Sequence, residues 1–409
     1  MTAHTAPRTA ADLDANDPLA GFVSRFIQSD QVVAYLDGNS LGRPLKTTVD
    51  RLGGFVTHDW GSRLIRSWDE QWMELPLTLG DRIGRITLGA AAGQTVVGDS
   101  TTVLLYKLIR AAVDARPGRT EIVIDRDNFP TDRFILEGVA AERGLTLRWI
   151  DTDPQGGVTA ELVADAVGMN TALVVLSQVA YRSGFVADVP AITAVAHAAG
   201  ALMLWDVCHS AGSVPTSLDA WGVDIAVGCS YKYLNGGPGA PAFAYVASKL
   251  QSSLNQPIWG WMGAADVFAM ADGFVAAEGM RRFLSGTPPV LGMVPMEDML
   301  DLIEEAGLDA IRSKSLALTT FVIEWTDAHL AQFGVTVGSP RRGERRGSHV
   351  TLLHPRFREV TRLLWERDVI PDFRFPTGLR IGLSPLSTTF AEVELGLTLV
   401  RDILDQLSD

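Results

Sequence analysis

The sequence contains little cysteine and lacks both a secretion signal and a long apolar run. Its two cysteines, Cys208 and Cys229, each lie in an apolar stretch and form neither a disulfide framework nor a metal-spaced cluster. The opening residues, "MTAHTAPRTAADLDANDPLA", lack a charged region followed by an apolar one, and no run of about 18 apolar residues could cross a membrane. We therefore expect a cytoplasmic protein with no bound metal and no membrane partner.

An excess of positive charge is also missing. Acidic residues outnumber basic ones by 48 to 35, which gives a formal net charge of −13 and argues against nucleic acid as the main partner. The 409 residues are 47% hydrophobic and 20% charged, so the chain can bury a large core and is long enough for two domains. These properties favour an enzyme or a binding protein for small molecules.

Short apolar runs recur between residues 95 and 250, among them "EIVID", "ALVVLSQV", "ALMLWDVC" and "DIAVGC". Several are separated by segments with helical spacing of apolar residues, such as "TVLLYKLIRAAVDA". Apolar strands that alternate with helices are typical of an α/β fold with a mostly parallel sheet covered on both faces.

The pattern changes near both chain ends, which predicts a smaller domain built from the two termini. We expect an N-terminal segment at residues 1–50 that joins this small domain, a large α/β domain at 51–290, and the rest of the small domain at 291–409. The charge run "RRGERR", from Arg341 to Arg346, is expected to be a solvated loop.

Ligands of such folds bind at the carboxyl ends of the strands, so the residues that follow each apolar run are candidates for a site. After "TVVG" comes "DSTT", which places Ser100, Thr101 and Thr102 at a helix N-terminus, where backbone N–H groups and hydroxyls suit a phosphate. An ordinary N-cap would have the same sequence. After "EIVID" comes Phe129, which could lie flat on a planar ligand or pack on the next helix.

The next two runs end near charged residues. Asp206 ends "ALMLWD", with His209 three residues later, and an acid at that place needs a cationic partner because burial is costly. Lys232 follows "DIAVGC", 26 residues after Asp206, which is about one strand, one helix and one strand. A lysine in a partly dry site is a usable nucleophile toward carbonyl groups.

A phosphate cradle, an aromatic plate, a carboxylate and a nucleophilic lysine are the groups that pyridoxal 5′-phosphate (PLP) requires. The lysine forms a Schiff base with PLP, and the carboxylate keeps the pyridine nitrogen protonated. The alternative is that Lys232 is a surface lysine and Asp206 a helix cap. The order and spacing of these groups favour PLP.

The chain also resembles kynureninase, a PLP enzyme of fold type I related to the class V aminotransferases. Blocks that carry the resemblance run from "YLDGNSLGRP" at residue 35 through "LIRSWDEQW", "WDVCHSAG", "GCSYKYLNGGPGAPAF", "RRFLSGTPP" and "RGSHVTLLHP" to "LRIGLSPLSTTF" at residue 390. The resemblance implies a large domain with a seven-stranded, mostly parallel sheet, and a homodimer whose active sites lie at the subunit interface.

The resemblance also implies roles for individual residues. Lys232, Tyr231 and Asp206 would be catalytic, with Lys232 bound to PLP and Tyr231 as a proton relay. The expected cofactor-binding residues include these and also Thr101, Thr102, Phe129, Asp132, His209, Trp261 and Thr287, of which Trp261 and Thr287 would reach the phosphate from the second subunit. Arg380 would pair with the substrate α-carboxylate, and the rest of the substrate pocket would comprise Ser40, Trp68, Gly286 and Thr287.

The implied reaction is hydrolysis of the Cβ–Cγ bond of L-kynurenine to anthranilate and L-alanine. A bulky Trp68 beside Gly286 and Thr287 favours kynurenine over its 3-hydroxy analogue. The chain departs from the family pattern at Ala180, Ala264 and Ser387, each of which removes a hydrogen bond or packing group expected at the site. A substituted kynurenine or related aryl-keto amino acid, used in a biosynthetic pathway rather than in tryptophan catabolism, is therefore an alternative substrate.

Three other functions share parts of this pattern. A cysteine desulfurase needs a mobile cysteine downstream of the lysine, and both cysteines here precede Lys232. An aminotransferase remains compatible with the general cofactor residues. A PLP-fold scaffold without activity is disfavoured because the lysine and its supporting residues are all present.

Overall fold

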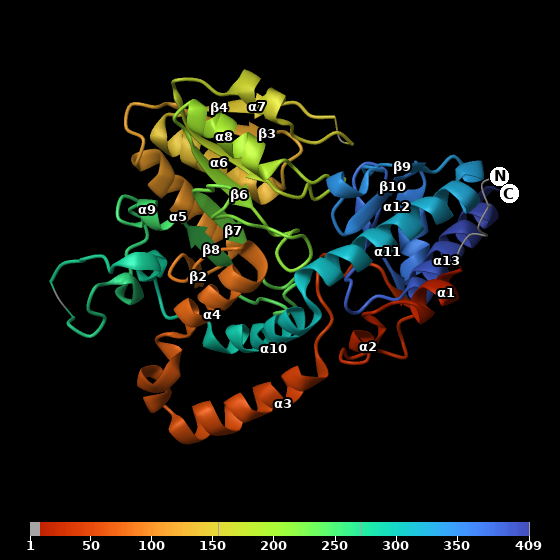
Figure 1. Ribbon diagram of the computed structural model, residues 1–409, viewed down its shortest axis with the longest axis horizontal. Helices are drawn as coiled ribbons and strands as arrows, with labels where there is room; N and C mark the ends of the chain where they lie inside the picture. The colour runs from red at the N-terminus through yellow and green to blue at the C-terminus, as the bar shows by residue number, and fades with distance from the viewer. Residues whose placement is uncertain (1–8, 154, 271, 409) are drawn as a thin grey trace.

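The computed structural model describes residues 9–153, 155–270 and 272–408. Figure 1 shows a large body of strands and helices from the middle of the chain, and beside it a smaller group in which helices from the two chain ends, α1 (Ala10–Ala15) and α13 (Phe390–Ser408), pack together. No helix in the described part of the chain is long and apolar enough to cross a membrane.

The large body contains a seven-stranded sheet in the order β2-β8-β7-β6-β5-β3-β4. Strand β8 runs antiparallel to its neighbours β2 and β7, and the other neighbouring strands pair in parallel. The mostly parallel sheet predicted from the apolar runs is thus confirmed. Its strands are β2 (Thr95–Val97), β3 (Glu121–Asp125), β4 (Thr146–Ile150), β5 (Thr171–Ser177), β6 (Leu202–Asp206), β7 (Ile225–Gly228) and β8 (Phe243–Val246).

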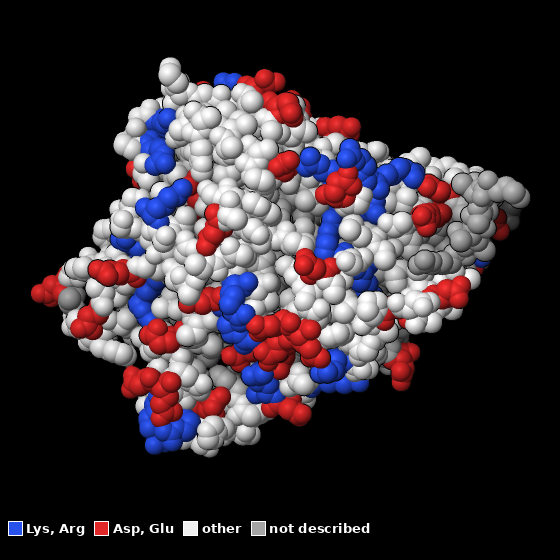
Figure 2. All heavy atoms as spheres, viewed as in Figure 1, with Lys and Arg blue, Asp and Glu red and all other residues white. Residues whose placement is uncertain are grey.

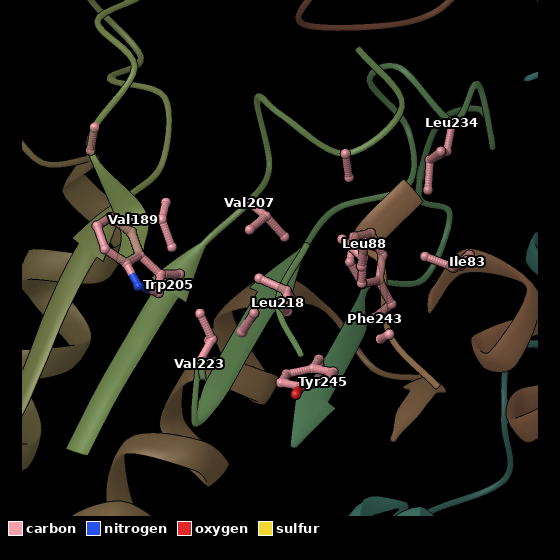
Figure 3. Packing of buried hydrophobic residues seen from close by; sticks show 14 of the residues in the cluster. Ile83, Leu88, Val189, Trp205, Val207, Leu218, Val223, Leu234, Phe243 and Tyr245 are labelled. Carbon is pink, nitrogen blue, oxygen red and sulfur yellow. The ribbon is translucent and has the colours of Figure 1, made fainter. Parts of the chain in front are cut away.

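Side chains of the central strands alternate between two hydrophobic clusters, which explains why these strands are apolar throughout. In β6, Leu202 and Leu204 belong to the cluster under α5 (Thr101–Asp114) and α6 (Pro130–Arg143). Met203 and Trp205 belong to the opposite cluster, which Figure 3 shows around Trp205, Phe243 and Tyr245. Helices that contribute to this second cluster include α4 (Leu75–Ile83), α7 (Ala160–Ala166), α8 (Val189–Ala198) and α10 (Val290–Ala306).

The smaller group has a four-stranded antiparallel sheet in the order β12-β13-β10-β9 and a two-stranded pair, β1-β11. Its strands are β1 (Ala34–Tyr35), β9 (Thr336–Val337), β10 (His349–Leu353), β11 (Val369–Ile370), β12 (Asp372–Arg374) and β13 (Gly378–Gly382). Its long helices are α11 (Leu308–His329), α12 (Phe357–Trp365) and α13. Strand β1 comes from the N-terminal segment, yet it pairs with β11 near the other end of the chain. The domain boundaries at residues 50 and 290 stay a prediction.

Helix α3 (Lys46–Gly54) and the π-helix η1 (Phe55–Arg63) extend along the lower edge of the molecule in Figure 1. Helix α10 carries an acidic face that pairs with arginines of α3, α4 and neighbouring segments, and Figure 2 shows these charges gathered over α10. The ion pairs are Arg25–Glu305, Arg51–Glu297, Arg51–Asp298, Arg51–Asp301, Arg82–Asp301 and Arg85–Glu304. They attach the N-terminal third of the chain to α10. Shorter helical turns are α2 (Ala20–Val23), η2 (Trp68–Trp72), η3 (Gly84–Leu88), α9 (Ser248–Gln251), η4 (Trp261–Gly263), η5 (Gly279–Phe283), η6 (Ala331–Phe333) and η7 (Gly343–Arg345).

The prediction of a solvated loop at Arg341–Arg346 is correct for Arg341 and Arg342 but wrong for Arg346. The Arg346 side chain is buried, and its guanidinium donates to the hydroxyls of Thr319 and Thr320 and to two backbone carbonyls. Because these partners accept hydrogen bonds from the guanidinium, the Arg346 side chain can be buried although the run is highly charged.

Candidate active site

A cavity of about 520 Å³ opens at the carboxyl ends of the strands, within the size range of cofactor sites. Residues at or after the ends of β2, β3, β5, β6 and β7 all line it, so the cavity lies where the sequence predicts a site. The cavity brings together ten of the residues predicted from the sequence: Thr101, Thr102, Phe129, Asp132, Asp206, His209, Tyr231, Lys232, Gly286 and Thr287.

One end of the cavity is formed by the N-terminus of α5. Ser100 is the N-cap, and its hydroxyl accepts a hydrogen bond from the backbone N–H of Val103 at 3.4 Å. Thr101 and Thr102 line the cavity in the first turn of this 14-residue helix. The ordinary N-cap is therefore compatible with an anion site, since Ser100 uses its side chain for the cap and leaves the two threonines at the cavity.

Lys232 lines the cavity and is almost completely buried. Its amine is 3.4 Å from Nδ1 and 3.3 Å from Nε2 of His209, and 5.9 Å from the centre of the Phe129 ring. The loop that carries Lys232 contacts the N-terminal segment, where the N–H of Gly42 donates to the Tyr231 carbonyl at 2.9 Å. A Cβ on Gly42 would lie 2.5 Å from the Lys232 carbonyl oxygen, so only glycine permits this approach.

Asp206 and Lys232 come from β6 and from the end of the neighbouring parallel strand β7, as their spacing predicts. Asp206 accepts a hydrogen bond from the backbone N–H of Cys208 at 2.6 Å. Close to it is Asp132, whose Oδ2 is buried and has no hydrogen-bond partner among the described residues. Burial, and then the charge of Asp206, raises the pKa of Asp132 well above its ordinary value.

This pair of acids tests whether PLP fits the cavity. Two adjacent buried carboxyl groups, one of them with an unpaired oxygen, require a donor that is also a cation. The protonated pyridine nitrogen of PLP is such a group, while Lys232 and Phe129 face the same space and the α5 N-terminus can receive the phosphate. The residues present therefore fit PLP.

Two other aromatic groups shape the site. Tyr231 keeps its proton at neutral pH because burial, followed by the neighbouring Cys229 and Cys208, raises its pKa. Tyr181, which the sequence analysis missed, lines the cavity and meets Phe129 edge-on with ring centres 5.2 Å apart. Its place four residues after the end of β5 is the signal that could have revealed it.

Four predicted residues lie outside the cavity as the described residues define it. Ser40 and Arg380 contact each other, with Arg380 Nη2 donating to Ser40 Oγ at 2.6 Å. Trp68 packs edge-on against Trp72, and Trp261 is partly exposed beside Phe268. Their predicted roles at the substrate or at the cofactor stay predictions. Within the described ranges, no group of His, Cys, Asp or Glu is arranged to hold a metal ion.

The fold is shared with known PLP enzymes. Among solved structures, a cysteine desulfurase from Escherichia coli superposes with a TM-score of 0.80 at 18% identity, covering 95% of this chain and 98% of that one. A variant of the cystine C–S lyase C-DES, which holds glycine covalently linked to its PLP cofactor, superposes with a TM-score of 0.77 at 18% identity, covering 90% and 96%. The aminotransferase class-V family matches residues 87–358. The fold and the site thus define a PLP-dependent enzyme of this class, with PLP fold type I.

Curated relatives narrow the class. The kynureninase of Pseudomonas fluorescens is 40% identical over 401 residues, which are 96% of this chain and 94% of the relative. The kynureninase of Burkholderia pseudomallei strain K96243 is 42% identical over 403 residues, 97% of this chain and 95% of the relative. The chain belongs to the kynureninase family, and the resemblance found in the sequence is confirmed.

Proposed function

We propose that the protein hydrolyses the Cβ–Cγ bond of L-kynurenine to give anthranilate and L-alanine. The observation that carries this proposal is the single cavity at which Lys232, Asp206, Phe129 and the N-terminus of α5 meet, in a chain of the kynureninase family. The reaction adds one water molecule and breaks one C–C bond. PLP, when bound, supplies a ring that draws electrons away from the substrate's α and β carbons.

Lys232 is the base for the α carbon. The free amine of Lys232 would take the proton from Cα of the substrate. The contact with His209 orients this amine, and Phe129 covers one side of the space in which it moves.

Asp206 and Asp132 would hold the ring nitrogen of the cofactor. Asp206, fixed by the Cys208 N–H, would be the carboxylate that keeps this nitrogen protonated. Asp132, with its raised pKa, is available as the protonated neighbour that avoids two adjacent negative charges.

Tyr231 is the candidate proton relay at the β carbon. Water adds to the γ ketone, and the C–C bond then breaks, which leaves an electron pair on Cβ that must gain a proton. A phenol that keeps its proton in the resting site can donate it and can recover a proton from the hydrated ketone. Tyr231 lines the same cavity as Lys232.

The substrate contacts are proposed from the family. Arg380 and Ser40 would bind the α-carboxylate, and Trp68, Gly286 and Thr287 would contact the aryl ring. A tryptophan offers little to pair with a 3-hydroxyl, so unhydroxylated kynurenine is the preferred substrate.

The assembly proposed is a homodimer. Large apolar side chains are exposed on two segments, one around α3 and η1 and one at residues 258–275, and both project at the left and lower left of Figure 1. They are Val49, Val56, Trp60, Leu64 and Ile65 in the first and Ile258, Trp259, Trp261, Phe268 and Val275 in the second. An apolar surface of this kind is typical of a protein interface. A monomeric mass by light scattering of the PLP-loaded enzyme would contradict the homodimer.

A cytoplasmic location is also proposed. Cys208 and Cys229 are both buried as free thiols, a state that a reducing compartment maintains. Fractionation of the native host followed by immunoblotting tests this location.

One assay tests the reaction. The PLP-loaded protein is incubated separately with L-kynurenine and 3-hydroxy-L-kynurenine, and release of the anthranilate product is followed by fluorescence. We expect product from both substrates with a higher kcat/KM for kynurenine. A PLP-loaded protein that releases neither product refutes the proposal, and formation of an amino acid from an added keto acid would assign an aminotransferase instead.

A further inference from the structure

Arg380 is enclosed by partners. Its side chain is 1% exposed, and it does not belong to the described lining of the cavity. Nη1 donates to the Tyr181 carbonyl at 2.9 Å, and Nη2 donates to Ser40 Oγ at 2.6 Å. With the Asn39 amide turned to satisfy its neighbours, its oxygen accepts from Nε of Arg380 at 3.2 Å. A substrate carboxylate can therefore reach this guanidinium only by replacing a partner.

Two of the partners are carboxyl groups. Asp372 Oδ2 lies 2.8 Å from Arg380 Nη2 and 2.5 Å from Arg374 Nε, so it pairs with both arginines. Asp37 Oδ1 lies 3.6 Å from the same Nη2, a longer and weaker contact. The four side chains form a group of two carboxyls and two guanidiniums, each with a side-chain exposure of 30% or less. We call these four residues the arginine-carboxyl quartet.

Without substrate, the two carboxylates and the two guanidiniums of the quartet balance each other in charge. A substrate α-carboxylate at Arg380 would bring a third negative charge to two positive ones in a mostly buried place, and an uncompensated charge there is costly. The simplest compensation is one proton on a carboxyl of the quartet. Asp372 is held by two short ion pairs. Asp37 has one ion pair, at 3.6 Å, and a hydrogen bond at 3.1 Å from the turned Asn39 amide, so it is the easier of the two to protonate.

The groups that face Asp37 support this choice. They are Arg380 on β13, Asp372 and Arg374 on β12, Tyr35 on β1, Ser40 in its own loop and Tyr233 after β7. Burial raises the pKa of Asp37 to about 6, with Asp372 reinforcing the rise and Arg380 opposing it. The negative charge of a bound carboxylate raises the pKa of Asp37 further, which favours uptake of a proton at neutral pH.

We propose that the substrate α-carboxylate binds Arg380 together with one proton, which Asp37 takes up, while Asp372 leaves Arg380 and stays with Arg374. The inference rests on the proposed function, because it takes Arg380 as the carboxylate-binding residue. Asp37 then acts as a positioning residue: it holds Arg380 before binding and releases it, in its neutral form, when substrate arrives.

The test measures protons rather than turnover. 4-Oxo-4-phenylbutanoate keeps the carboxylate and aryl ketone but has no amine, so it cannot exchange with Lys232 on the cofactor. Its binding to the PLP-loaded enzyme is followed by isothermal titration calorimetry at pH 7.0 in buffers of different ionisation enthalpy. We expect uptake of a substantial fraction of one proton, and an affinity that falls as the pH rises from the Asp37 titration in the free enzyme to that in the complex and then levels off. Butyrophenone, which lacks the carboxylate, should bind without proton uptake.

Two variants locate the proton. Asp37→Asn should remove the uptake and flatten the pH dependence of affinity. The matched control is Asp127→Asn, which removes an acid paired with Arg182 outside the quartet and should keep the uptake. Wild-type uptake near zero overturns the inference, and so does uptake that persists in Asp37→Asn. If Asp37→Asn does not fold, Asp37→Glu, which can still titrate, should retain the uptake, and its loss there counts against Asp37.

The outcome is separable from that for the proposed function. An enzyme that releases anthranilate but binds the ligand without proton uptake refutes only this inference. An enzyme that takes up the proton with the ligand but does not hydrolyse kynurenine refutes only the proposed substrate.

Discussion

The side-chain amine of Lys232 lies 3.3 Å from Nε2 of His209, and both residues are buried. Burial, followed by the charges of Lys232 and Arg380, lowers the pKa of His209 well below its ordinary value. The imidazole is therefore neutral at pH 7 and can hold the lysine by a hydrogen bond without adding a positive charge. A neutral His209 beside Lys232 suits a cavity that binds an anionic cofactor and in which the lysine must be free to act as a base.

Lys232→Ala should give a folded protein without turnover. The variant loses both the covalent link to PLP and the base at Cα, so kcat should fall by about a thousandfold or more. Anthranilate fluorescence and circular dichroism measure the two properties. Lys249→Ala, which removes an exposed lysine far from the cavity lining, is the control and should keep wild-type kcat. Retained activity in Lys232→Ala would mean that another lysine binds the cofactor.

Arg380→Lys should affect substrate binding more than the chemical step. Lysine keeps the positive charge that Asp372 and Asp37 require but cannot form two parallel hydrogen bonds to a carboxylate. We expect KM for kynurenine to rise by about tenfold or more while kcat changes less. Steady-state kinetics over a range of substrate concentrations check this split. An unchanged KM would assign the substrate carboxylate to a different residue.

Asp125→Asn should stabilise the protein increasingly as the pH rises. Burial, and then Asp127, raises the pKa of Asp125 from 3.8 to about 7. An acid with a raised folded-state pKa contributes stability that is full below pH 3.8 and is lost as the pH rises to about 7. The neutral amide avoids this loss, so the Tm difference between variant and wild type should grow from pH 4 to pH 7 and then level off. A difference that does not change with pH would contradict the ionisation of Asp125 in this range.

Arg51→Gln should destabilise the protein more than Arg85→Gln does. Arg51 pairs with Asp298, a carboxylate that is 6% exposed and otherwise accepts a hydrogen bond from Thr48. Its loss leaves a buried charge, at a cost of about 1–3 kcal/mol in the free energy of unfolding. Arg85 and Glu304 are both exposed, and such pairs contribute about 0–1 kcal/mol. Urea unfolding of both variants tests the difference, and equal losses would show that the burial of Asp298 is unimportant.

The sequence predicted the parts of the site that depend on parallel strands. Asp206 and Lys232 could be placed together because consecutive apolar runs of a doubly wound sheet lie side by side and end at the same edge. Ser100 and Phe129 followed from the same rule. Each of these residues lies at or shortly after the end of an apolar run, and the ends of these runs can be read from the sequence.

The surroundings of Arg380 could not be predicted in this way. Asp372 faces Arg380 because β12 and β13 pair antiparallel in one register, and a two-residue change in that register would separate them. Asp37 reaches the group through the pairing of segments at opposite ends of the chain. Arg346 is a similar case, since only its tertiary partners make its burial possible. Such pairings leave no periodic signal in a single sequence.

The reversed direction of strand β8 limits how this enzyme can be re-engineered. Residues 229–242 lead from the end of β7 straight back to its neighbour β8, so this span is tethered at both ends and carries Lys232 between them. Inserting or deleting residues here would shift the lysine against the rest of the cavity. Tags, circular-permutation sites and grafted peptides should therefore be placed elsewhere.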